Sequence, residues 1–351
     1  MKTGRSRLGG APLRAVKGIC AGMLLAMATA AQASPVVNLG AAGDYSGFFF
    51  GNLTAHSDIE GRLAVRGNVD INSITVGYRN PSARGPDGSA APSLVVGGNV
   101  KIRDGAIYNG PTDVGVNTNI GMGPAQAAWL SGGVQQGTGI YGGADLGSAK
   151  HLSLSKGEQA SIQQMFTDTA TLLRGLSGEL GTLGNTGTIT RGWDLGLHGG
   201  SAKPGAGLQI FNIGDSVLKA FTLDASSFDS DDYIVINLTA SGTLKFGYDY
   251  LGSNLAAFAD RLIFNVMNAD KVELHSGYGT LLASQADIIA ASSGHWEGTV
   301  IANNMLSTIE IGYEPMREQA LPARVPEPQG LALVALALGA MVLALRRRST
   351  R

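Results

Sequence analysis

The sequence predicts a mainly β protein: a β-solenoid, similar to a right-handed β-helix, with one long flanking α-helix. Three observations lead to this fold class. Glycine is abundant, with 51 residues in a chain of 351, about twice the usual share. Charged residues make up only 15% of the chain, which is not typical of a helical bundle. Short apolar segments with alternating polarity recur between Gly and Asn residues, a pattern typical of β-strands joined by tight turns.

Two segments in the first part of the chain resemble each other, Leu63–Ile71 and Leu94–Ile102. Each contains a strand, a Gly-Asn corner, and a second strand with alternating polarity. Gly and Asn tolerate the positive φ angles of tight corners. Each segment is therefore either a β-hairpin or one corner of a solenoid coil, and we favour the solenoid because the strands continue without a strict meander pattern. The run from Gly77 to Ala91 has the composition of a loop inserted between coils.

A helical pattern interrupts the strands between Ser155 and Leu180. Ser155 followed by Glu158 predicts a capping box at its start, and Gly175 and Gly178 mark its end. The face lacks the basic stripe of a membrane-surface helix, so we expect it to cover an apolar strip of the solenoid. The residues at helical spacing are Ile162, Met165, Phe166, Thr169, Ala170, Leu172, Leu173 and Leu176.

Strands resume after this helix. The predicted strands are Leu208–Ile213, Tyr233–Leu238, Leu262–Val266, Lys271–Leu274, Asp287–Ala290 and Trp296–Asn303. The chain from Glu310 to Arg324 is predicted as an extended linker. We place the boundaries of the β domain at 36–312, with the linker at 313–324.

The first 33 residues have the features of a secretory signal peptide. A basic segment precedes an apolar run from Ile19 to Ala31, and Ala31-Gln32-Ala33 provides a small-x-small cleavage site before Ser34. The only cysteine, Cys20, lies within this segment. The mature chain is therefore expected to have no disulfide, so packing and backbone hydrogen bonds must stabilise it.

The C-terminal segment 325–351 has three parts: a Pro-rich motif, an apolar run from Gly330 to Leu345, and a basic end. About sixteen residues form a helix of roughly 24 Å, which crosses a bilayer with slight thinning. Arginines after the run are typical of a cytoplasmic end. The alternatives are a permanent anchor without processing and a buried core helix. The motif and basic residues are Val325, Pro326, Glu327, Pro328, Arg346, Arg347 and Arg348.

This tail resembles the PEP-CTERM sorting signal of Gram-negative bacteria. The resemblance implies export through the inner membrane, transient anchoring there by a transmembrane helix, and processing by an exosortase-type enzyme. The processed protein would then reside at the cell surface or in the extracellular matrix.

The exported region resembles the choice-of-anchor A family. The similarity is carried by the segments Leu39–Leu53, Asp58–Asn68, Leu94–Asn99, Phe264–Val266 and Trp296–Asn303. The last of these departs from the family pattern, with Thr299 and Asn303 where the family has Ser and Pro. The resemblance implies an adhesin-like surface domain with a β-helical core, and it supplies no catalytic residues.

Charge excludes one class of partner. The chain has a net charge of −1, and its basic residues are concentrated in the two terminal signals. A somewhat acidic mature domain lacks the clustered Lys and Arg that nucleic acid requires.

The reactive side chains do not form a recognisable catalytic motif. The five histidines, His56, His151, His198, His275 and His295, are far apart in the sequence and form none of the paired zinc motifs. Asp58 and Glu60 would share one side of a strand, and we expect them at a solvated edge. In His295-Trp296-Glu297 we expect simple alternation of exposure.

One acidic turn has the oxygen density for calcium, at Asp229, Asp231 and Asp232. It lacks the glycine and the distal glutamate of an EF-hand loop. An ordinary acidic turn before the next strand is the simpler interpretation, so we expect no cofactor.

The function most consistent with these observations is a non-catalytic, adhesin-like role on the cell surface or in the extracellular polysaccharide of a biofilm. Flat β faces suit weak multivalent contacts with exopolysaccharide or a neighbouring cell. A polysaccharide lyase or hydrolase on a β-helix is one alternative, by fold analogy only. An ice-binding protein is another, although the regular Thr-x-Thr ladder expected for it is missing.

Overall fold

The computed structural model describes residues 37–55, 57–79, 90–111, 114–116, 128–130, 134–200, 207–218, 220–246, 253–290 and 294–317. All of them lie in the compact unit that begins at Pro35. Among them, no helix has both the length and the apolar character needed to cross a membrane. The predicted terminal signals lie outside the described residues, as does most of the predicted insert at 77–91. The signal residues concerned are Ala31, Ala33, Ser34, Val325, Pro326, Glu327, Pro328, Arg346, Arg347 and Arg348.

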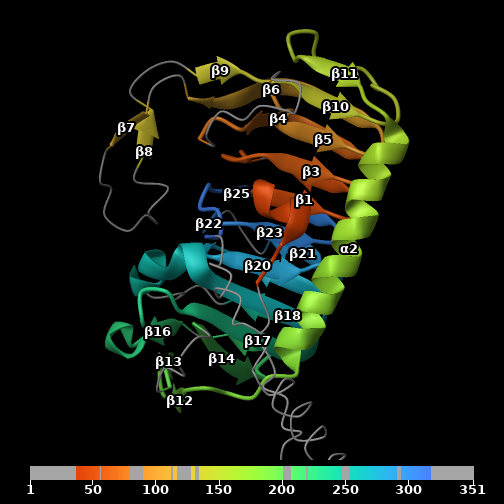
Figure 1. The fold of residues 1–351 in the computed structure, drawn as a ribbon. Helices are drawn as coiled ribbons and strands as arrows, with labels where there is room; N and C mark the ends of the chain where they lie inside the picture. Colours follow the sequence, from red (N-terminus) through yellow and green to blue (C-terminus); the bar gives the residue numbers. More distant parts are fainter. Residues whose placement is uncertain are drawn as a thin grey trace, which may run out of the picture. The chain divides into compact units, whose positions relative to one another are not determined.

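The described chain winds into a parallel β-solenoid, as predicted, and one side is a continuous parallel sheet (Figure 1). In spatial order this first sheet contains β11 (Leu154–Lys156), β10 (Gly139–Tyr141), β5 (Leu94–Val96), β3 (Leu63–Val65), β1 (Gly47–Phe49), β23 (Val300–Ala302), β20 (Thr280–Ala283), the first parts of β18 (Leu262–Leu274) and β17 (Tyr233–Phe246), and β14 (Leu208–Ile213).

A second parallel sheet forms another side of the coils. Its strands, in spatial order, are β6 (Val100–Pro111), β4 (Val69–Val76), β2 (Leu53–Ala55), β24 (Met305–Ser307), β21 (Asp287–Ala290), the last parts of β18 and β17, and β15 (Val217–Leu218). Register shifts in the β17–β18 pairing mark the point where these two long strands pass from the first sheet to the second.

The third side is shorter. Strands β19 (Gly277–Tyr278), β22 (Gly294–Glu297) and β25 (Ile309–Ile311) pair in parallel there. Ile59 bridges both Ile311 and Val76, which links the first coil to this side. At one end, β13 (Leu195–His198) pairs with β12 (Thr188–Arg191) and with β16 (Phe221–Leu223).

The remaining elements are short. Strand β9 (Val134–Gln136) pairs antiparallel with β6, and β7 (Val114–Val116) pairs with β8 (Ala128–Leu130). Three 3-10 helices are present among the described residues: η1 (Gly40–Asp44), η3 (Ala225–Ser227) and η4 (Ser253–Arg261).

The coils do not stack in chain order. Strand β1 lies between β3 and β23, so the first coil stacks on the last one. From β1 the chain winds outward to β11, and the helix α2 (Gln159–Gly181) then runs along the stack toward β14, as Figure 1 shows. The chain then winds back until β23 reaches β1. Its first and last coils therefore form the middle of the stack.

The two similar segments are solenoid corners, as we favoured. Strand β3 pairs with β5 and β4 pairs with β6, both in parallel, so the segments stack on each other and are not hairpins. Each corner asparagine holds the next coil: Oδ1 of Asn52 accepts from the backbone NH of Asn68, and Oδ1 of Asn68 accepts from that of Asn99, both at 2.8 Å. A Cβ at Gly67 or Gly98 would lie within 2.6 Å of a carbonyl oxygen of the preceding corner.

The ladder of corner asparagines also crosses from the first coil to the last. Oδ1 of Asn304 accepts from the backbone NH of Asn52 at 2.6 Å. On the far side, Asp287 Oδ1 accepts from Asn304 Nδ2 at 2.9 Å. The same device therefore joins coils that are adjacent in sequence and coils that are 252 residues apart.

The helix α2 covers the first sheet, as predicted, and its buried residues are Ile162, Phe166, Thr169, Leu173, Leu176 and Leu180. Phe166 packs on Phe48 of β1, with ring centroids 4.6 Å apart. Because this sheet is covered on one face by the helix and on the other by the core, both alternating sets of its side chains are mostly apolar. Of the residues predicted for the buried face, Leu172 is instead 39% exposed.

The predicted start of this helix is wrong. The helix begins at Gln159, Ser155 belongs to β11, and the N-cap residue Glu158 makes no capping hydrogen bond with its side chain. Pairing of β11 with β10 fixes Ser155 in an extended conformation, so strand formation prevails over the local capping signal. The helix also continues past Gly175 and Gly178 to Gly181.

Buried asparagines hold the C-terminal part of the helix. Asn237 and Asn265 are fully buried on adjacent strands. Asn237 Nδ2 donates to the Leu180 carbonyl at 2.9 Å, and Asn265 Nδ2 donates to that of Ser177 at 3.1 Å. The asparagines also bond to each other, with Asn265 Nδ2 2.8 Å from Asn237 Oδ1. The ladder therefore ties two strands of the first sheet to the backbone of the last turns of the helix, and it pairs the buried amide groups of the asparagines themselves.

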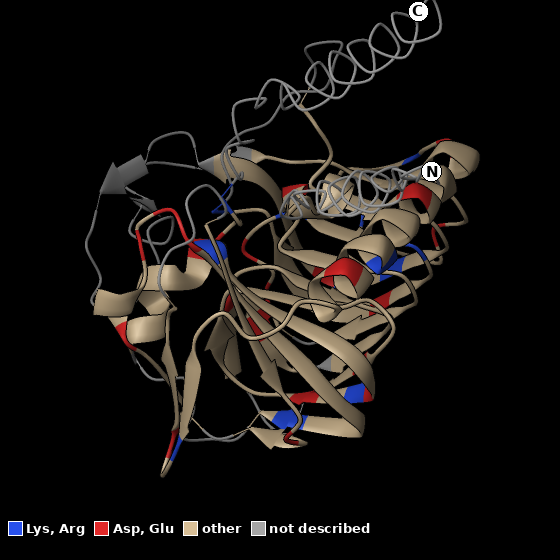
Figure 2. Ribbon diagram, turned by 60° about the horizontal axis from the view of Figure 1, so that its bottom comes forward, with Lys and Arg blue, Asp and Glu red and all other residues tan. Residues whose placement is uncertain are grey.

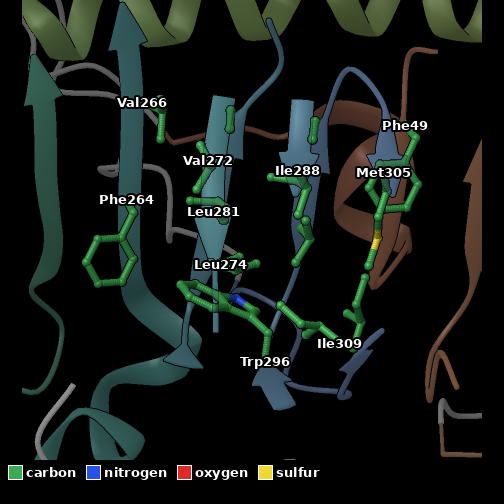
Figure 3. Close-up of a cluster of buried hydrophobic side chains, with 14 of the residues drawn as sticks. Phe49, Phe264, Val266, Val272, Leu274, Leu281, Ile288, Trp296, Met305 and Ile309 are labelled. Carbon is green, nitrogen blue, oxygen red and sulfur yellow. The ribbon is translucent and has the colours of Figure 1, made fainter. Parts of the chain in front are cut away.

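The interior of the coils is a single apolar cluster (Figure 3). Trp296 is fully buried there, with its ring close to those of Phe264 and Phe246. Its Nε1 donates to the Gly279 carbonyl at 2.8 Å. The large aromatic side chains thus fill the space between sheets without leaving a polar atom unsatisfied at the indole.

Two boundaries near the C-terminus need correction. The predicted strand Trp296–Asn303 is two strands, β22 and β23, separated by a corner at Gly298, which has a φ of 141°. Glu310 and Ile311, predicted to begin a linker, belong to β25. Pairing with β22 makes this segment the last part of the solenoid.

Candidate contact surface

The outward side chains of the second sheet form a broad surface, which we call the open face. The strand register places one row of them across the whole sheet. Neighbouring strands in such a row are about 4.8 Å apart. The row contains Val217, Lys245, Glu273, Ile289, Leu306, Thr54, Asp70 and Lys101.

Charges of both signs are paired on the open face. Lys245 Nζ lies 2.8 Å from Glu273 Oε2, and Arg103 Nη1 lies 2.8 Å from Asp70 Oδ1. Arg103 also donates to Asn72 Oδ1 at 2.8 Å. Figure 2 shows that acidic and basic residues are scattered among each other over the ribbon as a whole. Such exposed pairs contribute little to stability, but they give the face a polar character without a strong field of one sign.

Exposed apolar side chains accompany these charges. Leu306, in the middle of the row, is 64% exposed, and Val217, at one end, is 58% exposed. Near that end, the turn between β12 and β13 carries Trp193, which is 77% exposed. The Arg191–Asp215 pair, at 2.8 Å, ties this turn to the chain just before β15. An exposed indole of this kind suits contact with an apolar sugar face or another surface.

The acidic turn does not gather its carboxylates. Asp232 is buried, and its Oδ2 accepts from the backbone NH of Asp229 at 2.9 Å and from Gln209 Nε2 at 3.2 Å. Asp231 points to solvent and lies 3.9 Å from Arg317 Nη1. Among the described residues, the potential metal ligands that lie close together do not include any aspartate of this turn. The geometry is that of a capped turn, with one aspartate used inside it.

The expected solvated edge at Glu60 and the expected alternation at His295 and Glu297 are wrong. Glu60 is 2% exposed and Glu297 is 6% exposed. Together with His295 they form a group whose potential ligand atoms all lie within 4.8 Å of one another. We call this group, together with Glu310, Tyr78 and Arg79, the seam cluster, because Glu60 belongs to the first coil and the histidine and other glutamates belong to the last coils.

Electrostatics within the seam cluster are strong. Burial lowers the pKa of His295, but the carboxylates of Glu297 and Glu310 outweigh it and raise this pKa to about 10. The hydrogen bond from His295 is the main reason why the pKa of Glu310 is lowered. Burial, together with Glu60 and Glu310, raises the pKa of Tyr78. Sequence reasoning missed the cluster because Glu60, Tyr78 and Arg79 lie more than two hundred residues before His295, Glu297 and Glu310.

The other described histidines do not join this cluster. His198 lies 3.1 Å from Asp224 in an exposed pair, and His151 Nε2 lies 2.8 Å from the Gly105 carbonyl oxygen. His275 is buried just after the end of β18, and His56 lies outside the described residues. Among the described residues, these three histidines do not join a group of potential metal ligands.

A parallel solenoid with a helix along one sheet and an open second sheet defines a class of extended β-solenoid domains. The chain belongs to the family described as "Putative Ice-binding-like adhesive domain", whose model matches residues 38–313. Among solved structures, an ice-binding protein from the Antarctic ascomycete Antarctomyces psychrotrophicus is 13% identical, with a TM-score of 0.35, covering 79% of this chain and 98% of that one. A glycosylated ice-binding protein from an Arctic yeast is 10% identical, with a TM-score of 0.27, covering 84% and 100%. The comparison with curated proteins gives no match.

Proposed function

We propose that this protein is an exported, non-catalytic adhesive protein of the cell surface or extracellular matrix, and that the open face is its contact surface. The observation that carries the proposal is the row of paired charges and exposed apolar side chains across the second sheet. Many weak, regularly spaced contacts suit a repetitive partner such as exopolysaccharide or a neighbouring cell surface. Membership of an adhesive-domain family supports the same role.

A binding assay with a matched pair of variants tests the open face. Leu306→Lys places a charge in the middle of the row, whereas Leu172→Lys places one on the exposed part of α2. The mature protein is mixed with insoluble matrix polysaccharide and the bound fraction is measured after sedimentation. We expect the Leu306 variant to lose several-fold in retention and the Leu172 variant to match the wild type. Equal retention of both variants, or no retention of the wild type, contradicts the proposal.

The route to the surface is part of the proposal and rests on the sequence. We propose that the choice-of-anchor A resemblance and the PEP-CTERM-like tail describe one pathway, in which an exosortase-type enzyme processes the tail at the inner membrane. Replacement of Pro326, Glu327 and Pro328 by alanine tests it by cell fractionation. We expect the variant to stay in the membrane fraction. An unchanged distribution instead supports a plain membrane anchor.

Ice binding is the second candidate, because the family description names it. The open face argues against it, since paired Lys, Arg, Asp and Glu side chains hydrate strongly and the row carries a single threonine, Thr54. Thermal hysteresis of the wild-type protein decides between the two. A measurable freezing-point gap that is lost in the Leu306→Lys variant assigns ice binding to the open face, whereas no gap excludes it.

A further inference from the structure

We propose that the seam cluster is a binding site for one divalent transition-metal cation of the zinc type, held by His295, Glu297 and Glu60 where the first and last coils meet. The proposal is independent of adhesion, because none of these residues lies on the open face. A cation here would bond the two terminal coils of the solenoid to each other.

The strand register places the ligands around one point. Ile59 pairs with Ile311, and Ile311 pairs with Trp296, so Glu60, Gly312 and Glu297 follow in neighbouring positions of three adjacent strands. The backbone of Gly312 lies between the two glutamates, with its NH donating to the Trp296 carbonyl at 2.7 Å. The potential ligand atoms of Glu60, His295 and Glu297 lie within 4.8 Å of one another.

Gly312 leaves room for an ion. A Cβ built on it would meet Glu297 Oε2 at 2.5 Å and His295 Nε2 at 2.7 Å. Both atoms therefore point to the same small space beside the glycine. The absence of a side chain at this position keeps that space open between the two coils.

One ligand atom is buried and lacks a hydrogen-bond partner. Among the described residues, no hydrogen-bond donor reaches Glu297 Oε2. The side chain of Glu297 is only 8% exposed, so solvent does not readily replace such a donor. His295 Nε2 lies 2.7 Å from Glu297 Oε1 without the alignment of a hydrogen bond. An unsatisfied buried carboxylate oxygen is costly. Coordination of a cation would satisfy it.

The other ring nitrogen of His295 is also placed as in metal sites. Nδ1 lies 3.3 Å from Glu310 Oε2, and Tyr78 donates to Glu310 Oε1 at 3.2 Å. A metal-ligating histidine usually donates its second N–H to a carboxylate in this way, which directs the free nitrogen to the metal. Glu310 and Tyr78 are thus positioning residues.

Charge balance favours a divalent ion. Of the three carboxylates of Glu60, Glu297 and Glu310, Arg79 balances one, since its Nε lies 3.2 Å from Glu60 Oε1. A cation bound at Nε2 displaces the proton from that nitrogen. With the imidazole then neutral, two negative charges remain, and a divalent cation neutralises them. An imidazole ligand is unusual for calcium or magnesium, whereas zinc accepts mixed nitrogen and oxygen ligands. Zinc ligands lie about 2.0–2.2 Å from the ion, so the side chains would close slightly around it.

The test uses the mature protein after treatment with a chelator. Isothermal titration with Zn²⁺ is expected to show one equivalent bound, and the Tm is expected to rise with free Zn²⁺. Ca²⁺ and Mg²⁺ should produce neither effect. Cobalt(II) should give the visible absorption of a low-symmetry bound ion. A wild-type protein that retains no Zn²⁺ overturns the proposal.

Variants locate the ion. His295→Gln and Glu297→Gln should lose at least about 100-fold in affinity for Zn²⁺, and Glu310→Gln about 10–100-fold. His198→Gln, which alters an exposed His–Asp pair of similar distance, should bind as the wild type does. Gly312→Ala keeps every ligand but fills the space, so it should fold and yet fail to bind. Wild-type affinity in both His295→Gln and Gly312→Ala contradicts the site, even if other variants do not fold.

Discussion

Gly298 illustrates what a single missing side chain does in this solenoid. Its φ of 141° lies in a region that L residues rarely adopt, and a Cβ would lie 2.2 Å from the Gly279 carbonyl oxygen. The corner between β22 and β23 therefore requires glycine. Because glycine is frequent throughout the sequence, Gly298 did not stand out as a corner, and the sequence pattern suggested a continuous strand.

Substitution of this glycine should be costly. We expect Gly298→Ala to lower the free energy of unfolding by about 2–4 kcal/mol, through backbone strain and a steric clash. Gly175→Ala is the control, because its Cβ would meet no atom within 4 Å and alanine favours the helix by about 0.5–1 kcal/mol. Urea unfolding followed by circular dichroism measures both, and equal stability of the two variants would contradict the argument.

The buried asparagine ladder gives a second prediction. Asn237→Ala leaves the Leu180 carbonyl and the amide of Asn265 with fewer partners. We expect a loss of about 2–3 kcal/mol, because buried polar groups become unsatisfied. Asn268→Ala, on an exposed position of the same sheet region with one hydrogen bond to Thr239, should cost much less. Urea unfolding of the two variants measures the difference, since a shift of the midpoint with an unchanged m-value reports a change in the free energy of unfolding.

The half-buried Tyr45 sets a pH dependence. Burial is the main cause that raises its pKa to about 12, above the value of about 10 in an unfolded chain. The folded state therefore holds the proton more tightly, and this contribution to stability is complete below about pH 10 and is lost as the pH rises toward 12. Tyr45→Phe should show a shallower loss of stability in this range, and identical profiles would refute the assignment.

At the scale of elements, the helix is the clearest test of how the sheet is covered. Leu173 is fully buried against the first sheet, whereas its neighbour Leu172 is 39% exposed. We expect Leu173→Ala to cost about 2–5 kcal/mol, and Leu172→Ala to cost under about 1 kcal/mol. Thermal unfolding of the two variants checks this, since similar losses would mean that the helix is oriented differently.

The elements also show where sequence reasoning succeeds and where it stops. The helical spacing from Ile162 to Leu176 identified the buried face, because a 3.6-residue period is a local property. The capping box predicted at Ser155 does not form, because Ser155 belongs to β11, which pairs with β10. Glu60 could not be predicted as buried, since its partners Arg79, Tyr78 and the Tyr313 backbone NH come from the segments that follow β4 and β25. Burial of a charge depends on such distant partners.

For the whole molecule, the repeated Gly-Asn corners indicated a solenoid but not the order of its coils. A Gly-Asn corner predicts that the chain turns and that another coil stacks on it. It does not specify which coil of the solenoid is that neighbour. The pairing of Phe48 with Ile301 joins opposite ends of the domain, and no local pattern contains that information. The open face likewise could not be predicted from the sequence, because Lys245 and Glu273 become neighbours only through the register of β17 and β18.

The coil order predicts where the structure is most protected. Strands β1 and β23 have neighbours on both sides, while β11 and β14 lie at the two ends of the first sheet. Local opening begins where contacts are fewest. In native-state hydrogen exchange, amides of β1 and β23 should therefore exchange more slowly than those of β11 and β14. The reverse order would show that the junction between the first and last coils opens before the two ends of the stack.

The junction of the first and last coils also decides how the domain carries tension. Solenoids whose ends are free can unravel by peeling away one repeat at a time. Here a pull on the chain beyond β25 enters at the centre, where Asn304 is bonded to Asn52 and coils on both sides share the strain. A molecule gripped by its surroundings across the open face and tethered at its carboxyl side would thus resist traction with its whole stack.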